Sequence, residues 1–168
     1  MSVTAPSWVF GYGSLIWRQD FPFLDARDAQ LTGWVRRLWQ GSHDHRGTPE
    51  DPGRVATLVA DAQAQCIGRA FLVAPDVFEH LDYREKNGYS RLRVSLDLGS
   101  DAVDGVTYVG HPDNPAFLGD APLAEIVTQV RRCVGESGSN IEYVVELDRA
   151  LRNLGAPDAH IAEIASQL

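Results

Sequence analysis

The sequence predicts an α+β fold in which a mixed β-barrel is flanked by helices. Segments of β-type residues fill the first half of the 168-residue chain, and helical periodicity fills the second half. No linker-like stretch separates the two halves. We therefore expect residues 1–168 to form a single domain, since domains commonly contain about 100–150 residues.

The expected strands are short runs rich in apolar and β-branched residues. They are Ser7–Gly11, Gln30–Gln40, Arg54–Val59, Cys66–Val73, Ser90–Leu98 and Val103–Val109. A polar turn around Asp61–Gln65 is expected to join the third and fourth of these strands. Their number and spacing favour an antiparallel or mixed sheet curled into a barrel. The polar segment Ser42–Gly53, rich in glycine and proline, is expected to be a loop long enough to cover a binding site.

The expected helices follow a change of period in the second half of the chain. Pro122 should open a helix whose apolar stripe contains Leu123, Ile126, Val127, Val130 and Val134. Asn140 should N-cap a second helix that ends at Gly155, and Pro157 should begin a short last helix.

Composition excludes several classes of function. The formal charge is −8, from 15 basic and 23 acidic residues, so the surface should repel the phosphates of nucleic acids. No apolar run approaches the roughly 18 residues of a membrane span, and Met1–Ser7 lacks the pattern of a signal peptide, so a cytoplasmic protein is expected. Cys66 and Cys133 stand apart from any CxxC motif, which favours buried thiols over a disulfide framework or a zinc site.

The first candidate site is the glycine-rich segment Gly11–Leu15 (GYGSL), directly after the first strand. Glycines on both sides of Tyr12 let the backbone turn sharply and approach a ligand closely. Backbone N–H groups in such a turn can hold a carboxylate or an oxyanion. An ordinary turn between strand and loop is the alternative. Ser14 is not expected to be a nucleophile, because Tyr12 and Ile16 replace the glycines of the G-x-S-x-G motif.

The second candidate site is the segment Asp76–Tyr89, which is expected to form a helix with Asp76 as its N-cap. Phe78, Leu81 and Glu85 fall at i, i+3 and i+7, so Glu85 continues the apolar stripe. A carboxylate on an inward stripe is desolvated or lines a cavity, which raises its pKa and suits a general base and acid. A solvated helix end, with ion pairs to Arg84 and Lys86, is the alternative interpretation.

Other polar residues give weaker indications. His43 and His45 flank Asp44, but a single H-x-H without a further ligand does not predict a metal site, and solvated loop residues are expected. Arg37 and Arg46 are candidates for pairing with a substrate carboxylate, with solvation at the surface as the alternative.

Several long segments, taken in order, resemble the ChaC-type glutathione-specific γ-glutamylcyclotransferases. The resemblance extends from about Trp8 to Leu154. Its segments are Trp8–Trp17, Gly33–Arg37, Trp39–Ser42, Asp44–Pro49, Leu81–Tyr89, Pro112–Pro115 and the helix near Asn140 that carries Glu142 and Tyr143.

The resemblance implies a γ-glutamylcyclotransferase-like mixed β-barrel flanked by helices, with no cofactor and no metal. It implies an enzyme that acts on a small molecule, glutathione or another γ-glutamyl peptide, and releases 5-oxoproline. Glu85 would be the catalytic acid and base. The residues expected to bind the γ-glutamyl group are Gly11, Tyr12, Gly13, Ser14, Leu15, Ile16 and Tyr143. The alternative is a non-catalytic module that binds a γ-glutamyl ligand or regulates transport.

Overall fold

The computed structural model describes residues 5–84 and 88–168. In this part of the chain a closed barrel is formed by β1 (Ser7–Gly11), β2 (Asp25–Ser42), β3 (Gly53–Val73), β4 (Ser90–Asp97) and β5 (Ala102–Val109), in the order β1-β3-β2-β4-β5. Neighbouring strands are antiparallel, except that β1 and β5 pair in parallel. The predicted mixed barrel is confirmed.

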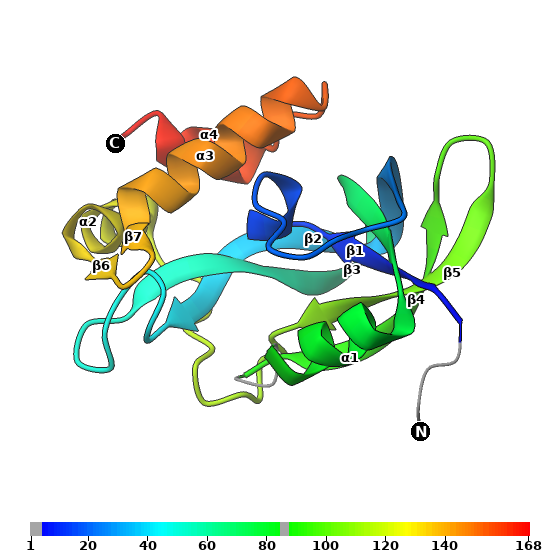
Figure 1. Ribbon diagram of the computed structural model, residues 1–168. Coiled ribbons are helices and arrows are strands. Elements are labelled where there is room, and N and C mark those ends of the chain that lie inside the picture. Colours follow the sequence, from blue (N-terminus) through cyan, green and yellow to red (C-terminus); the bar gives the residue numbers. More distant parts are fainter. Residues whose placement is uncertain (1–4, 85–87) are drawn as a thin grey trace.

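The helices cover the barrel on two sides (Figure 1). On one side α2 (Leu123–Arg132), α3 (Asn140–Asn153) and α4 (Ala159–Ala165) pack together. On the other side α1 (Pro75–Arg84) buries Phe78 and Leu81 against Val9 and Phe71 of the barrel. A small hairpin of β6 (Val134–Gly135) and β7 (Gly138–Ser139) joins α2 to α3. None of the helices in the described ranges is long and apolar enough to cross a membrane.

The prediction of a turn around Asp61–Gln65 is wrong, because β3 runs without interruption over 21 residues. Its pairing with β2 shifts between Thr32 and Trp34, where Gly33 has a φ of +92°. The polar residues of β3 bulge outward opposite this glycine while the pairing resumes on both sides. A polar run therefore marks an irregularity in a long hairpin. The loop between β2 and β3 spans residues 43–52, within the predicted loop segment Ser42–Gly53, whose two end residues belong to the strands.

Four predicted helix boundaries are wrong. The last helix, α4, begins at Ala159 after its N-cap Asp158 and not at Pro157. Helix α2 ends at Arg132, and Val134, expected on its stripe, lies exposed in β6. Ser139, not Asn140, N-caps α3, since its hydroxyl accepts the Glu142 N–H. Helix α1 begins at Pro75, a residue suited to the first helical position, so Asp76 lies in the first turn instead of capping it.

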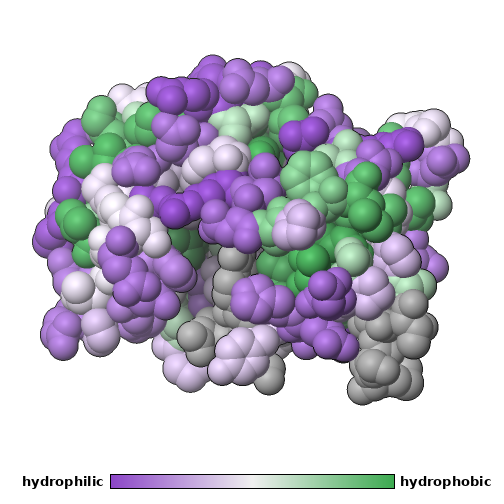
Figure 2. Space-filling model, viewed as in Figure 1, coloured by the Kyte–Doolittle hydropathy of each residue, from purple (hydrophilic) through white to green (hydrophobic). Residues whose placement is uncertain are grey.

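The surface and the cysteines agree with the expectations from composition. Figure 2 shows hydrophilic residues over most of the displayed face, with hydrophobic residues gathered in smaller areas. Cys66 and Cys133 are buried and free, as predicted. Burial raises the pKa of the Cys66 thiol to about 11, so this thiol is protonated at neutral pH.

Candidate functional site

A pocket lies where the segment after β1 meets β3, β5 and α3. It has a volume of ≈ 70 Å³ and is lined by Phe10, Gly11, Tyr12, Gly13, Ser14, Leu15, Ala56, Tyr89, Tyr108 and Tyr143. The structure thus brings the predicted segment Gly11–Leu15 together with Tyr143, from the opposite end of the chain. Ile16, also a predicted binding residue, is instead buried in the core cluster beneath the helices.

The glycines of the segment are required by close packing. A one-turn 3₁₀ helix, Ser14–Ile16, starts directly after Gly13. A Cβ atom on Gly13 would lie 2.9 Å from the hydroxyl oxygen of Tyr143, and one on Gly11 would lie 2.7 Å from Cβ of Leu15. Contacts this short do not occur between real side chains, so glycine lets the backbone reach Tyr143 and fold back on itself.

The tyrosines of the pocket are fixed by backbone hydrogen bonds. The Tyr12 hydroxyl donates to the carbonyl oxygen of Tyr108 at 2.5 Å. The Tyr143 hydroxyl accepts the N–H of Ala56 at 3.0 Å, and the Tyr143 ring packs edge-on against Trp17. These contacts join β1, β3, β5 and α3 around one hollow, so the pocket belongs to the rigid barrel and not to a loop alone.

Phe10, Ala56, Tyr89 and Tyr108 line the pocket but were not singled out by the sequence analysis. Tyr89 ends a segment that carried the family resemblance, which is a usable signal. Tyr108 lies in a correctly predicted strand, β5. A sequence pattern of this length does not show which side chains of the strand face inward. Nothing marks Ala56, since its contribution is a backbone N–H.

The predicted catalytic residue, Glu85, lies outside the described residues, together with Lys86 and Asn87. The apolar stripe that led to this residue is present in α1, where Phe78 is 3% and Leu81 1% exposed. Tyr89, on the other side of the undescribed residues, lines the pocket.

Arg46 and Arg37, the candidate partners of a substrate carboxylate, are engaged by the protein. The Arg46 guanidinium is buried, donates to the Ser139 carbonyl at 3.0 Å and lies 5.7 Å from the centre of the Tyr143 ring. Arg37 donates to the carbonyl of Arg36 at 2.8 Å. Arg46 therefore contacts the ring of a pocket residue, Tyr143, without lining the pocket itself.

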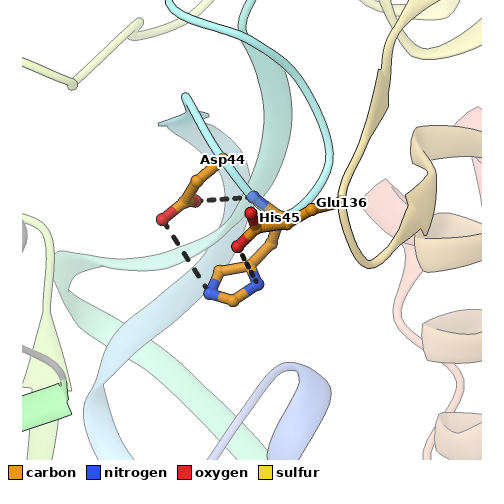
Figure 3. Close-up of side chains that lie close together, drawn as sticks. All are labelled: Asp44, His45 and Glu136. Atoms are coloured by element: carbon orange, nitrogen blue, oxygen red, sulfur yellow. Dashed lines mark hydrogen bonds and ion pairs between the residues drawn. The ribbon is translucent and has the colours of Figure 1, made fainter.

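The loop histidine His45 lies close to two carboxylates, those of Asp44 and Glu136 (Figure 3). Their potential ligand atoms lie within 4.8 Å of one another, and these are the residues that could hold a metal ion in the described part of the chain. All of them are exposed, and Nδ1 of His45 already contacts the Ser137 hydroxyl at 2.8 Å. His43 is not part of the group. The group joins the 43–52 loop to the β6–β7 hairpin, where the Glu136 N–H also donates to the Asp44 carbonyl.

Comparison with known proteins gives consistent matches over nearly the whole chain. The family model described as ChaC-like protein matches residues 7–168. The chain is 40% identical to Gamma-glutamylcyclotransferase 2-3 of Arabidopsis thaliana, over 96% of this chain and 87% of that protein. It is 39% identical to human Glutathione-specific gamma-glutamylcyclotransferase 1, over 94% of this chain and 76% of that protein.

A solved structure supports the same relationship. The fold matches the crystal structure of a yeast γ-glutamyl cyclotransferase specific to glutathione with a TM-score of 0.90 and 28% identity, covering 98% of this chain and 96% of that one. The chain belongs to the ChaC-like protein family.

Proposed function

We propose that this protein cleaves the γ-glutamyl amide bond of glutathione and releases 5-oxoproline and Cys-Gly. The main observation that supports the proposal is a pocket lined by both Gly11–Leu15 and Tyr143. The relatives of this chain are named as γ-glutamylcyclotransferases. We further propose that residues 1–168 act as one cytoplasmic domain with a small-molecule substrate and no nucleic-acid or membrane partner. The net charge of −8 supports the exclusion of nucleic acids.

The reaction needs no nucleophile from the protein. The α-amino group of the γ-glutamyl residue attacks the δ-carbonyl carbon of the same residue, and a five-membered ring closes. The C–N bond to the next residue breaks, and its nitrogen leaves as an amine. One amide replaces another, so the reaction consumes neither an oxidant nor a water molecule. Ser14 therefore serves as a pocket residue and not as an attacking group.

Proton transfer is the first task of the enzyme. An α-amino group has a pKa of about 8, so it is largely protonated at neutral pH and must lose a proton before it can attack. The leaving nitrogen must gain one. A single carboxyl group can perform both transfers in turn, and we assign this role to Glu85. The support is that Glu85 follows a helix with a buried stripe, and that Tyr89, four positions later, lines the pocket.

Holding the substrate in a bent conformation is the second task. Amine and carbonyl must lie close together within a small hollow, and well-oriented intramolecular reactions gain up to about 7–11 kcal/mol from such positioning. The pocket combines aromatic walls with fixed hydroxyl groups, as expected for a site that orients a small polar molecule. Backbone donors of the Gly11–Leu15 segment are suited to stabilise the oxyanion that develops on the δ-carbonyl, each worth about 3 kcal/mol.

A substrate panel tests the proposal. The purified protein is incubated with glutathione, γ-glutamylcysteine and γ-glutamylalanine, and the products are identified by mass spectrometry. We expect 5-oxoproline and Cys-Gly from glutathione, with less product from the shorter compounds. Glutathione that raises the melting temperature without being consumed would instead favour the non-catalytic binding module.

Glu85→Gln tests the acid–base role. Because the substitution preserves shape and removes the titratable group, we expect at least a hundredfold loss of kcat. Glu79→Gln, on the exposed side of α1, is the matched control and should retain activity. Wild-type turnover by Glu85→Gln would remove Glu85 from this role.

A further inference from the structure

Arg36 of β2 is a buried arginine that reaches the backbone of the pocket. It is 3% exposed, and each of its guanidinium nitrogens has its own acceptor. Nε donates to the Tyr12 carbonyl at 2.6 Å, and Nη2 donates to the Ile67 carbonyl at 2.5 Å. Nη1 donates to the Asp158 carboxylate at 2.9 Å. A buried charge is tolerated only when it is paired and hydrogen-bonded, and Arg36 meets both conditions.

Asp158 links this arginine to the last helix. One oxygen of its carboxylate accepts from Arg36, and the other accepts the N–H of Ile161 at 3.2 Å as the N-cap of α4. The planar guanidinium fork suits three acceptors that lie in different directions, whereas the single ammonium of lysine does not. Arg36 thus ties the segment after β1 to β3 and to α4.

The contact with Tyr12 determines which way the next peptide N–H points. In a planar trans peptide the carbonyl of Tyr12 and the N–H of Gly13 point in opposite directions, and the described residues contain no cis peptide. With the carbonyl directed at Arg36, the N–H of Gly13 points away from Arg36, and Gly13 lines the pocket. Within residues 5–84 and 88–168 no acceptor is found for this N–H.

We propose that Arg36 is a positioning residue, which orients the Tyr12–Gly13 peptide so that the Gly13 N–H faces the γ-glutamyl group of the substrate. The inference rests on the proposed function for the identity of that ligand. The geometry of the peptide itself does not depend on it. Arg36 touches no substrate in this arrangement and acts through the peptide that it holds.

Arg36→Lys, with Arg54→Lys as the matched control, tests the proposal. Arg54 is also a buried arginine, 5% exposed, and it donates to the carbonyls of Leu38 and Gly119, away from the Tyr12–Gly13 peptide. Kinetics are measured at a temperature at which circular dichroism shows both variants to be folded. Since a 1 Å misplacement can cost about a hundredfold, we expect Arg36→Lys to raise KM for glutathione about fivefold or more and to lower kcat about tenfold. Arg54→Lys should leave KM within about twofold of wild type. A purely structural loss would lower the folded fraction, and hence apparent kcat, without changing KM.

A second measurement needs no substrate. The amide signal of Gly13 in an NMR spectrum of ¹⁵N-labelled protein should move in Arg36→Lys and stay in place in Arg54→Lys. Should Arg36→Lys fail to fold, Asp158→Asn takes its place, because the amide keeps the cap of α4 while disturbing the Arg36 contact. An unmoved Gly13 signal with an unchanged KM, or equal changes in both arginine variants, overturns the proposal. If wild-type protein releases no 5-oxoproline, the proposed function fails, and the Gly13 signal alone still decides the role of Arg36.

Discussion

Gly13→Ala probes the close contact on which the pocket depends. The added Cβ atom would lie 2.9 Å from the Tyr143 hydroxyl oxygen, and its next neighbour, Cβ of Ala56, would lie at an ordinary 3.6 Å. Since ordinary contacts begin at 3.4 Å, the hydroxyl must retreat by about half an ångström. That movement stretches its 3.0 Å hydrogen bond from the Ala56 N–H beyond the usual range.

The expected cost follows from these distances. Overpacking of this kind destabilises by about 1–3 kcal/mol. A half-ångström displacement of pocket atoms should lower kcat/KM for glutathione about tenfold, since 1 Å can cost a hundredfold. Thermal unfolding and steady-state kinetics measure the two effects separately.

A double-mutant cycle with Tyr143→Phe isolates the contact. Phenylalanine lacks the oxygen that the new Cβ meets, so Gly13→Ala should cost less stability in the Tyr143→Phe background than in wild type. Equal costs in both backgrounds, or a Gly13→Ala variant with wild-type stability and kcat/KM, would refute the packing account of this glycine.

Further predictions concern residues that do not line the pocket. Nε2 of His160 accepts the Leu38 N–H at 3.0 Å, and burial, aided by the charge of Arg37, lowers the pKa of His160 from its ordinary 6.5 to about 4. As the pH falls, His160 takes up a proton in the unfolded chain before it does so in the folded protein. The contribution of neutral His160 to the free energy of unfolding is therefore complete above pH 6.5 and is lost as the pH falls toward 4, by at most about 3 kcal/mol. Urea unfolding across this range checks it, and His160→Gln should flatten the dependence. Asn140→Ala removes the hydrogen bonds to the N–H and carbonyl of Arg54, both 2.8 Å, and should destabilise by about 2–4 kcal/mol, measured as a fall in melting temperature beside the exposed control Glu163→Ala. Cys66 should resist thiol reagents in native protein because its thiol is buried with a raised pKa, and rapid labelling without denaturant would contradict this.

Local patterns were sufficient to predict the elements of the barrel. Alternation of polar and apolar residues identified β4, a run of apolar and β-type residues indicated β5, and the glycine-rich segment was placed at the end of β1. The continuity of β3 was not predictable, because a polar run of this kind usually forms a turn, and only pairing with β2 keeps it extended. Pairing between distant strands overrides the local preference here.

The candidate site was predicted in part for the same reason. The segment Gly11–Leu15 and Tyr143 were named from the sequence, and the fold brings them to one pocket. Ala56 contributes a backbone N–H and Tyr108 a backbone carbonyl to the hydrogen bonds of the pocket tyrosines, and such backbone contacts leave no mark in the sequence. Asn140 looked like an N-cap, yet its side chain pairs with the backbone of Arg54, a contact that exists only once α3 packs on β3. Arg36 likewise pairs with Asp158, a residue far along the chain that no local pattern connects to it.

Isotope labelling of the product tests the central claim most directly. Wild-type protein is incubated with glutathione in water enriched in ¹⁸O, and the released γ-glutamyl product is analysed by mass spectrometry. Intramolecular attack by the substrate's own amine predicts 5-oxoproline that carries no ¹⁸O from the solvent. Glutamate, or 5-oxoproline labelled with ¹⁸O, would show that water attacks the δ-carbonyl and would contradict the account.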